Sequence, residues 1–568
     1  MKKLLALLLA LVMVFALAAC GQQPATPTAE PTGTPAVDEV PNPEPDWTAY
    51  NALIAQIKTT TDFAERVNLM HEAEDILMAS GAILPIYYYN DLFMMKPDVE
   101  GFYANAFGFK FFQYCTNGDS NTLKINLASE PDYLDPALNS SVDGACLAIM
   151  GFGGLYTYDA DGQLIPNFAE GYEMSEDGLT YTFTLKEGLK WSDGSDLTAN
   201  DFVYSWKRGA DPVTAADYSY MFNGIAGYED HDLQVSAPDD LTLVVNLIAP
   251  CAYFLDLAAF PTFYPVKQTE VEAAADWETN PGAWCQDVGF VSCGPYILES
   301  WVHEESMVYV KNPNWYDADN VTIERIEFML SSDDTAIFAA YNAGDLDFID
   351  TVPTDEIKNL KDNPEFHIID NLGTYYVCFN VKSDLFAGKT AEQANAMRLA
   401  FSELVDRQYI IDTVGQCEQE IATSFIPAGM ADGNGGIFKD AAGWDYPVDD
   451  GYYGTEVDVD GAIALLKEAG YEFDDNGMLS ASNPIAFEYL TNDTSGHVAI
   501  AECIQQDLAA VGITMTIRSI DWATFLQERK AGNYDIARNG WLADFNDPIN
   551  MLEMWETSSG NNDCQFGR

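Results

Sequence analysis

The stretch that decides the fold is residues 522–548, WATFLQERKAGNYDIARNGWLADFNDP, near the end of the chain. Its first part places Trp522, Phe525 and Leu526 at the three- and four-residue spacing of an apolar helix face. Residues 534–537 then favour a short strand, which we expect to run into a loop at Gly540 and Trp541. A helix followed directly by a strand is typical of mixed α/β proteins.

The same stretch places a carboxylate between two large aromatic side chains. Asp544 follows Trp541 at a spacing of three residues and directly precedes Phe545. One interpretation is structural, with Asp544 capping a buried strand. The other is a site for a zwitterion, in which Asp544 pairs with an ammonium group that Trp541 and Phe545 shield from water. Arg538 or Arg529 would then bind a carboxylate, and a free peptide is a molecule of this kind.

Helices and strands are interleaved over the rest of the chain. After Asp62, a favourable N-cap, apolar residues recur at helical spacing over residues 63–77, and Gly81 is placed to end the helix. Asp159 to Gly162 predicts a hairpin turn, because Leu164 stands where a calcium loop of the EF-hand type needs glycine. Strands are predicted at 123–127, 181–185, 241–247, 307–310 and 375–380.

Composition excludes several classes of function. The 568 residues include 27 Lys and Arg against 89 Asp and Glu, a formal net charge of −62, which would repel a nucleic-acid partner. The ten cysteines contain no CxxC pair and the five histidines are scattered singly, so we expect no metal site. No phosphate-binding loop or nucleophile elbow occurs, and we therefore assign no catalytic residue and no cofactor.

The first 45 residues predict export and anchoring. Lys2 and Lys3 precede an uncharged apolar run over residues 4–16, which has the form of a signal peptide. The run ends Leu-Ala-Ala-Cys20, which resembles the bacterial lipobox, so Cys20 is the predicted lipidation site; the alternative is an ordinary cleavage site. Residues 21–45 contain seven prolines and no aromatic residue, a composition that favours an extended tether.

Motifs along the folded part resemble the oligopeptide-binding proteins of bacterial ABC importers, which are family 5 extracellular solute-binding proteins. Each motif is weak by itself, but their number and order make the resemblance specific. They are ASEPDYLDP at 128–136, GLY at 154–156, WSDG at 191–194, LTANDFVYSWKR at 197–208, CGPY at 293–296, NPNWY at 312–316, AGDLD at 343–347 and RNGWLADFNDP at 538–548.

The resemblance implies a two-lobed periplasmic-binding-protein fold of type II, in its large oligopeptide-binding subclass with an extra subdomain. It implies that Asp544 binds the α-amino group of a peptide. It places five further residues in the cleft, Tyr218, Trp522, Arg529, Arg538 and Trp541.

By the same resemblance the protein is a monomeric, membrane-anchored binding protein, not an enzyme. It captures oligopeptides and delivers them to the transmembrane permease subunits of an ABC importer. Other solutes carried by this scaffold stay open as alternatives, namely nickel complexes, haem, glutathione and oligosaccharides, and so does a lipid-anchored surface hydrolase.

The order of the chain departs from the family. Residues 46–101 resemble the family's extreme C-terminus, yet they precede its N-terminal strand. We predict a circular permutation. One alternative is a gene-assembly artefact that mimics a permutation, and another is a permuted product that does not fold and has no function. The expected parts are a signal peptide (1–19), anchor and tether (20–45), a first lobe with an extra subdomain (90–372), and a second lobe made from 46–89 and 373–568.

Overall fold

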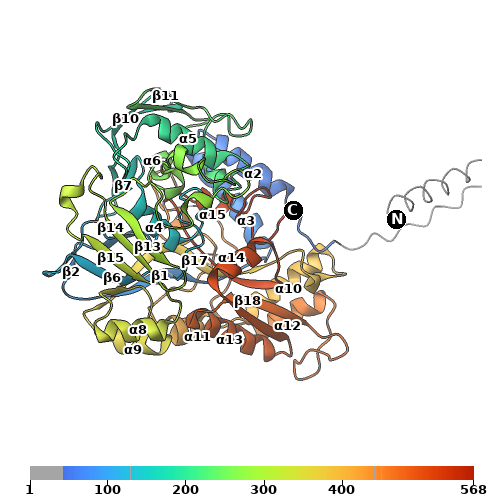
Figure 1. Cartoon of the computed structure of the whole chain (residues 1–568). Helices are drawn as coiled ribbons and strands as arrows, with labels where there is room; N and C mark the ends of the chain where they lie inside the picture. The colour runs from blue at the N-terminus through green and yellow to red at the C-terminus, as the bar shows by residue number, and fades with distance from the viewer. Residues whose placement is uncertain (1–41, 128, 441–442, 449–450) are drawn as a thin grey trace, which may run out of the picture. The chain divides into compact units, whose positions relative to one another are not determined.

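The computed structural model describes residues 42–568 apart from 128, 441–442 and 449–450, so the predicted signal peptide, Cys20 and most of the tether lie outside the described residues. A ten-stranded sheet forms the centre of this part of the chain, in the order β13-β14-β15-β6-β16-β1-β17-β20-β18-β19 (Figure 1). In that order, the strands are Tyr296–Val302, Ser306–Lys311, Arg325–Met329, Thr122–Asn126, Phe348–Ile349, Ile83–Met95, Phe366–Phe379, Ile536–Leu542, Ala486–Asn492 and Thr514–Ile520.

Two long antiparallel strands join the two ends of this sheet. β1 pairs with β16 near its C-terminal end, and β17 pairs with β20 through its C-terminal half. Their register breaks where Tyr88 pairs with Thr374 and Asn90 pairs with Asp370, so residues 371–373 of β17 lie opposite Tyr89 alone. The parallel pairs lie outside this ribbon, with β6 between β15 and β16, and β18 between β20 and β19.

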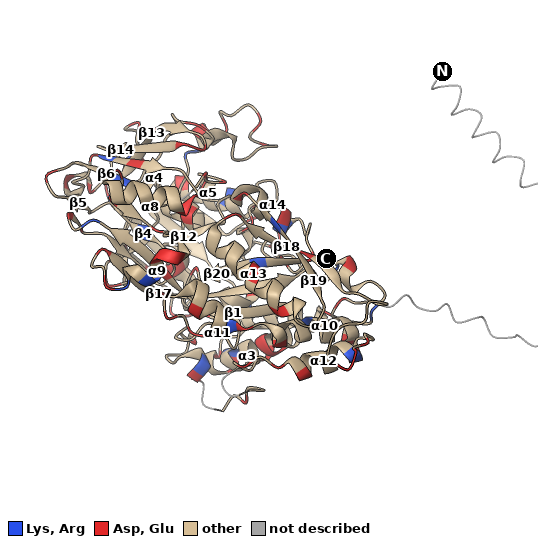
Figure 2. Cartoon of the chain, turned by 90° about the horizontal axis from the view of Figure 1, so that it is seen from below, with Lys and Arg blue, Asp and Glu red and all other residues tan. Residues whose placement is uncertain are grey.

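Helices cover the sheet and carry many of the acidic residues. α13 contacts β18 and β19, α8 contacts β16, and α2, α3 and α15 contact one another. Figure 2 shows Asp and Glu on many elements, α9 and α12 among them, so the negative charge is not confined to one region. The helices are α2 Thr48–Thr59, α3 Phe63–Ala79, α4 Val142–Gly151, α5 Ala199–Ala210, α6 Phe254–Leu257, α7 Gln268–Val271, α8 Asp334–Ala343, α9 Thr354–Leu360, α10 Ala391–Leu404, α11 Arg407–Ile410, α12 Val459–Glu468, α13 Ser495–Ala509, α14 Trp522–Lys530 and α15 Ile549–Glu553.

A separate antiparallel sheet has the strand order β11-β12-β10-β9 and packs against α5 through β11 and β12. Its strands are Val235–Asp239, Thr242–Asn246, Thr180–Leu185 and Ala169–Met174. The remaining strands form two-stranded pairs, which are β2 Val99–Glu100 with β5 Thr116–Asn117, β3 Tyr103–Ala104 with β4 Lys110–Phe111, and β7 Tyr156–Tyr158 with β8 Leu164–Pro166.

Most of the predicted elements are confirmed. The Asp62 carboxylate caps α3 by accepting from the backbone N–H groups of the second and third residues after it, at 3.0 and 3.2 Å. Gly81, just beyond α3, has a φ of +64°. The turn at 159–162 joins β7 to β8, and all five predicted strands lie in sheets. The strand predicted at 375–380 is only the end of β17, which continues back to Phe366 because β1 supplies a partner along its first half.

The boundaries predicted near Trp541 are wrong. The strand begins at Ile536 rather than Tyr534, and Gly540 and Trp541 belong to β20 instead of a loop. This position of the strand requires glycine because the Tyr89 side chain occupies the space that a Cβ would take. A Cβ on Gly540 would lie 2.1 Å from the Tyr89 hydroxyl. In the sequence, a strand glycine that lets a neighbouring side chain approach the backbone thus cannot be distinguished from a glycine in a turn.

The first described residues pack against the last ones. The Trp47 indole N–H donates to the Trp555 carbonyl oxygen at 2.8 Å, and the Tyr50 hydroxyl donates to the Leu552 carbonyl oxygen at 2.7 Å. The rings of Trp47 and Phe566 stack with centroids 3.7 Å apart. The two ends of the folded chain therefore share one core.

A buried ion pair ties α3 to the segment that follows β20. The Arg66 guanidinium donates two hydrogen bonds to the Asp547 carboxylate, at 2.8 and 2.7 Å. Asp547→Ala would leave this guanidinium buried without its carboxylate, and we expect a loss of about 3–5 kcal/mol in the free energy of unfolding. Asp232→Ala is the control, because Asp232 pairs with Lys207 on the surface at 3.6 Å and should contribute little. Denaturant unfolding curves measure both, and equal losses would contradict the prediction.

Candidate functional site

A cavity of about 400 Å³ lies against the β1–β17 ribbon and is lined by residues from both ends of the large sheet. Loops and helices next to β6 and β16 supply one wall, and β20, α13 and α14 supply the other. The structure brings all six residues predicted for the cleft to this cavity, Tyr218, Trp522, Arg529, Arg538, Trp541 and Asp544.

Asp544 is a buried carboxylate with hydrogen-bond donors but no cation beside it. Its Oδ1 accepts from the Tyr218 hydroxyl at 3.2 Å and its Oδ2 accepts from the Asn550 side-chain amide at 2.9 Å. Burial raises the pKa of this carboxyl to about 7, although both hydrogen bonds oppose the rise. Within the described residues Asp544 has no ion-pair partner, so a ligand cation is the group that would compensate its charge.

Asn550 holds the carboxylate and the indole together. Its side-chain oxygen accepts from the Trp541 indole N–H at 2.9 Å and from the Asp544 backbone N–H at 3.0 Å. The sequence analysis missed this residue. Its position six residues after Asp544, behind a proline that starts α15, was the only available signal, and a lone asparagine carries little chemical information.

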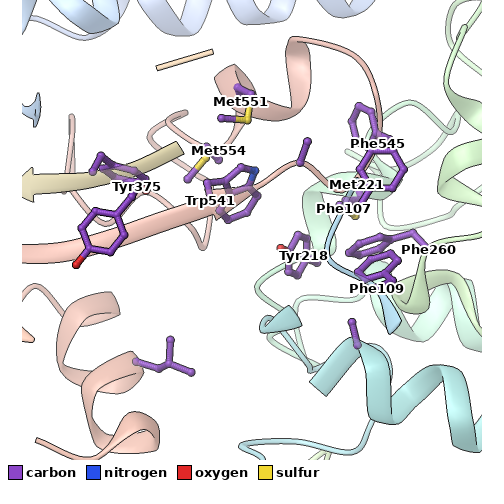
Figure 3. Close-up of a cluster of buried hydrophobic side chains, with 14 of the residues drawn as sticks. Phe107, Phe109, Tyr218, Met221, Phe260, Tyr375, Trp541, Phe545, Met551 and Met554 are labelled. Atoms are coloured by element: carbon purple, nitrogen blue, oxygen red, sulfur yellow. The ribbon is translucent and has the colours of Figure 1, made fainter. Parts of the chain in front are cut away.

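Aromatic rings form the wall around Asp544. The Tyr218 ring lies between those of Trp541 and Phe260, with centroids 6.0 and 5.4 Å away (Figure 3). Phe545, predicted to shield the carboxylate together with Trp541, does not line the cavity and stacks on Tyr253 with centroids 4.3 Å apart. Shielding on the cavity side therefore comes from Trp541 and Tyr218.

Arg538 is held on aromatic faces next to a neutral histidine. Its guanidinium lies 5.4 Å from the Trp522 ring centroid and 5.7 Å from that of Tyr375. One of its N–H groups donates to His497 Nε2 at 2.5 Å, and burial together with this cation lowers the pKa of His497 well below its usual value. Because a neutral imidazole cannot compensate a positive charge, Arg538 can still bind an anionic group.

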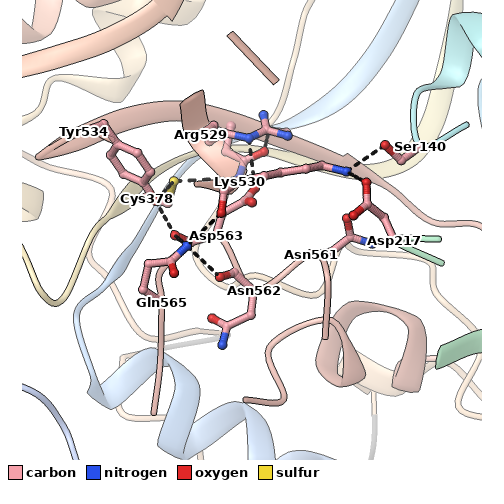
Figure 4. A network of polar contacts seen from close by, with 12 residues as sticks. Ser140, Asp217, Cys378, Arg529, Lys530, Tyr534, Asn561, Asn562, Asp563 and Gln565 are labelled. Carbon is pink, nitrogen blue, oxygen red and sulfur yellow. Dashed lines mark hydrogen bonds and ion pairs between the residues drawn. The ribbon is translucent and has the colours of Figure 1, made fainter. Parts of the chain in front are cut away.

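Arg529 and Lys530 are already paired with carboxylates. Arg529 Nε lies 2.9 Å from Asp563 Oδ2. Lys530 extends to Asp217, with which it forms an ion pair, and donates to the Ser140 hydroxyl at 2.8 Å (Figure 4). Of the two arginines predicted to bind a carboxylate, only Arg538 has no carboxylate partner among the described residues.

Comparison with known proteins places this geometry in a family. The profile described as bacterial extracellular solute-binding proteins, family 5 middle, matches residues 163–563. The chain belongs to this family. It is 32% identical over 460 residues to the oligopeptide-binding protein OppA of Bacillus subtilis, a match that covers 78% of this chain and 79% of the relative. It is 31% identical over 465 residues to the periplasmic OppA of Salmonella typhimurium, covering 79% of each chain.

Solved structures agree with the sequence match. Listeria monocytogenes OppA bound to peptide superposes with a TM-score of 0.69 at 28% identity, covering 79% of this chain and 86% of that one. The Escherichia coli murein tripeptide binding protein MppA superposes with a TM-score of 0.68 at 27% identity, covering 78% and 84%. The two-lobed type II fold and the expectation of a binding protein rather than an enzyme are thereby confirmed. Within the described part of the chain, no helix has the length and apolar character needed to span a membrane.

The raised pKa of Asp544 predicts a pH-dependent cost to folding. A carboxyl that holds its proton more tightly in the folded protein lowers stability as pH rises from about 4 to about 7, and the cost is constant above that range. Asp544→Asn removes the ionisable group, so its ligand-free form should be the more stable, by up to about 4 kcal/mol near pH 8. Denaturant curves of both proteins at several pH values measure the difference, and a difference that is the same at every pH would contradict the prediction.

Proposed function

We propose that the protein captures peptides with a free N-terminus and delivers them to an ABC importer. The observation that carries the proposal is Asp544, a buried carboxylate in the cavity wall that is held by Tyr218 and Asn550 and has no ion-pair partner among the described residues. An α-ammonium group is the natural partner for such a carboxylate. Related structures support this, since one is Listeria monocytogenes OppA bound to peptide and another is Haemophilus influenzae OppA in complex with RPPGFSPFR.

Contacts between the two walls of the cavity support a closed, ligand-holding state. The Gln416 side-chain amide donates to the Thr354 carbonyl oxygen at 3.0 Å, and Ser495 on α13 hydrogen-bonds to Asp334 on α8. The Tyr218–Asp544 hydrogen bond also joins the two walls, and breaking these contacts would let the walls separate. We propose that peptide exchange occurs by this opening, as in hinged binding proteins.

The N-terminal region completes the proposal. Lipidation at Cys20 and the proline-rich tether would hold the protein at the membrane, where it would meet the permease subunits of the importer as a monomer. Stable anchoring by acyl chains needs two chains or a second membrane signal. This part of the proposal rests on the sequence of residues 1–45.

Asp544→Asn tests the peptide site. Removing the charge that faces the ammonium should weaken binding of a free peptide about a hundredfold or more, with the fold intact. Isothermal titration calorimetry measures the affinity, and an N-acetylated peptide should bind poorly to both proteins.

Asp256→Asn is the matched control for this substitution. Asp256 is a half-buried carboxylate whose pKa burial raises to about 6, but it does not line the cavity, so its substitution should leave affinity unchanged. Equal affinities of the wild type and Asp544→Asn would remove Asp544 from the site.

We also propose that the chain is a circular permutation of the family order. Trp47 stacks on Phe566, and Asn51 hydrogen-bonds to Thr557 at 2.8 Å, so the proposed natural junction joins neighbours in space. The match with Bacillus subtilis OppA leaves about a fifth of each chain unaligned. That is the share expected if residues 1–45 do not align and residues 46–118 have changed place, because residues 1–118 make up about a fifth of this chain.

Restoring the family order tests the permutation. The variant chain runs from 119 to 568 and continues with 46–118. The cut between 118 and 119 lies in an exposed turn, and β5 stays in the same segment as its partner β2. This chain should fold and bind peptide within about threefold of the original affinity. A chain cut between Lys124 and Ile125, inside β6, should not fold, because the break divides a central strand. An unfolded 119–568/46–118 chain would contradict the permutation.

A further inference from the structure

A group of charged residues lines the cavity apart from the partners of Asp544. It consists of Asp91 on β1, Lys110 on β4, Asp143 on α4 and Asp350 after β16, and we call it the Lys110 cluster. Lys110 Nζ lies 2.6 Å from Asp91 Oδ2 and 3.8 Å from Asp350 Oδ2. The Lys110 side chain is 4% exposed, whereas those of Asp91 and Asp350 are 24% and 14% exposed.

The Lys110 cluster contains more carboxyl groups than ammonium groups. Three carboxyl groups share one ammonium group, so at least one of them either lacks a full counter-charge or holds a proton. Burial raises the pKa of Asp143 to about 6, and burial and the neighbouring carboxylates raise the pKa of Asp350 although Lys110 opposes this rise. A second positive group placed among these carboxylates would relieve their mutual repulsion.

Asn371 provides an independent sign of a ligand at this place. Its side chain is 8% exposed, lines the same cavity, and has no hydrogen-bond partner for either its oxygen or its nitrogen among the described residues. It lies in the irregular segment of β17 opposite Tyr89. A Cβ added to Gly108 would lie 3.6 Å from Asn371 Nδ2 and 3.1 Å from Val142, so the amide and the first turn of α4 both lie next to Gly108, two residues before Lys110.

Buried amides are normally hydrogen-bonded, and two unpartnered atoms on one side chain are uncommon. Asn90 Oδ1, also on the cavity wall and one residue from Asp91, likewise lacks a partner among the described residues. These acceptors are suited to the N–H groups of an ammonium or guanidinium side chain. Asn371 can in addition donate to a peptide carbonyl.

We propose that the Lys110 cluster and Asn371 form a second subsite of the cavity, which selects peptides carrying a lysine or arginine side chain. The inference rests on the proposed peptide-binding function and adds a preference to it. Asp544 takes the N-terminal ammonium with Tyr218 and Asn550, while the Lys110 cluster takes a side-chain cation, and the two sets share no residue.

Matched tripeptides test the preference by calorimetry. Alanine tripeptides with lysine at the first, second or third position are compared with the same peptides carrying norleucine, which has a similar side chain without the charge. At one position lysine should bind about tenfold or more tightly than norleucine, as expected for a hydrogen bond to a charged group in a buried site. Glutamate at that position should bind more weakly than norleucine.

Variants of the Lys110 cluster test which residues produce the preference for lysine. Asp143→Asn with Asp350→Asn keeps the Lys110–Asp91 pair, and the ratio of lysine to norleucine affinity should fall toward one. The two single variants are measured as well, so that a double variant that does not fold leaves the test in place. Asp493→Asn is the control, since Asp493 lines the cavity outside the Lys110 cluster, and it should keep the lysine preference.

The outcomes separate the two proposals. Tripeptide binding with equal affinity for lysine and norleucine at every position would overturn the second subsite and leave the proposed function standing. An unchanged lysine preference in all three variants would also overturn it. Failure of every peptide to bind would overturn the proposed function, and this inference with it.

Discussion

Antiparallel pairing between β1 and β17 fixes the cavity, because it joins the two ends of the large sheet. β1 bonds to β16 on one side and β17 bonds to β20 on the other. A one-residue slip between them would turn Tyr89 and Asp91 away from the cavity. The break in register opposite Tyr89 gives the ribbon an irregular segment where it crosses the sheet, and this segment carries Asn371. The backbone hydrogen bonds of this ribbon thus hold in place strands that themselves carry residues of the cavity wall.

The charges around the cavity follow a simple division. Arg529 and Lys530 are paired with Asp563 and Asp217, so they join neighbouring segments of the protein. Asp544 and Arg538 have no oppositely charged partner among the described residues, although each is buried. Burying an unpaired charge is unfavourable, and proteins keep such groups where function requires them. A zwitterionic ligand would supply both missing charges at once. Binding would then remove the unfavourable burial of two unpaired charges, and this gain would contribute to the affinity.

The order of the chain matters less to this structure than the contacts between its ends. α2 and α3 pack on α15, and the Arg66–Asp547 pair buries two charges between segments far apart in sequence. Such contacts depend on distance in space and not on which segment is translated first. This is the physical reason why a chain with the proposed rearranged order could retain the family's core.

Residue type and spacing alone determined the mixed α/β class, α3 with its Asp62 cap, and the excess of negative charge. The order of motifs added the family, and the six cleft residues followed from matching positions. The sequence could not show whether Gly540 lies in a strand or in a turn, because the deciding contact comes from Tyr89, some 450 residues away in the chain.

Tertiary structure alone decided which charges are free. Arg529 and Arg538 look equivalent in the sequence, yet Asp563 neutralises one and a neutral His497 contacts the other. Asn550 and the Lys110 cluster likewise gain their roles from neighbours that folding brings close. The physical reason is that charge compensation and burial depend on distances in space, and spacing along the chain predicts those distances only within one helix or strand.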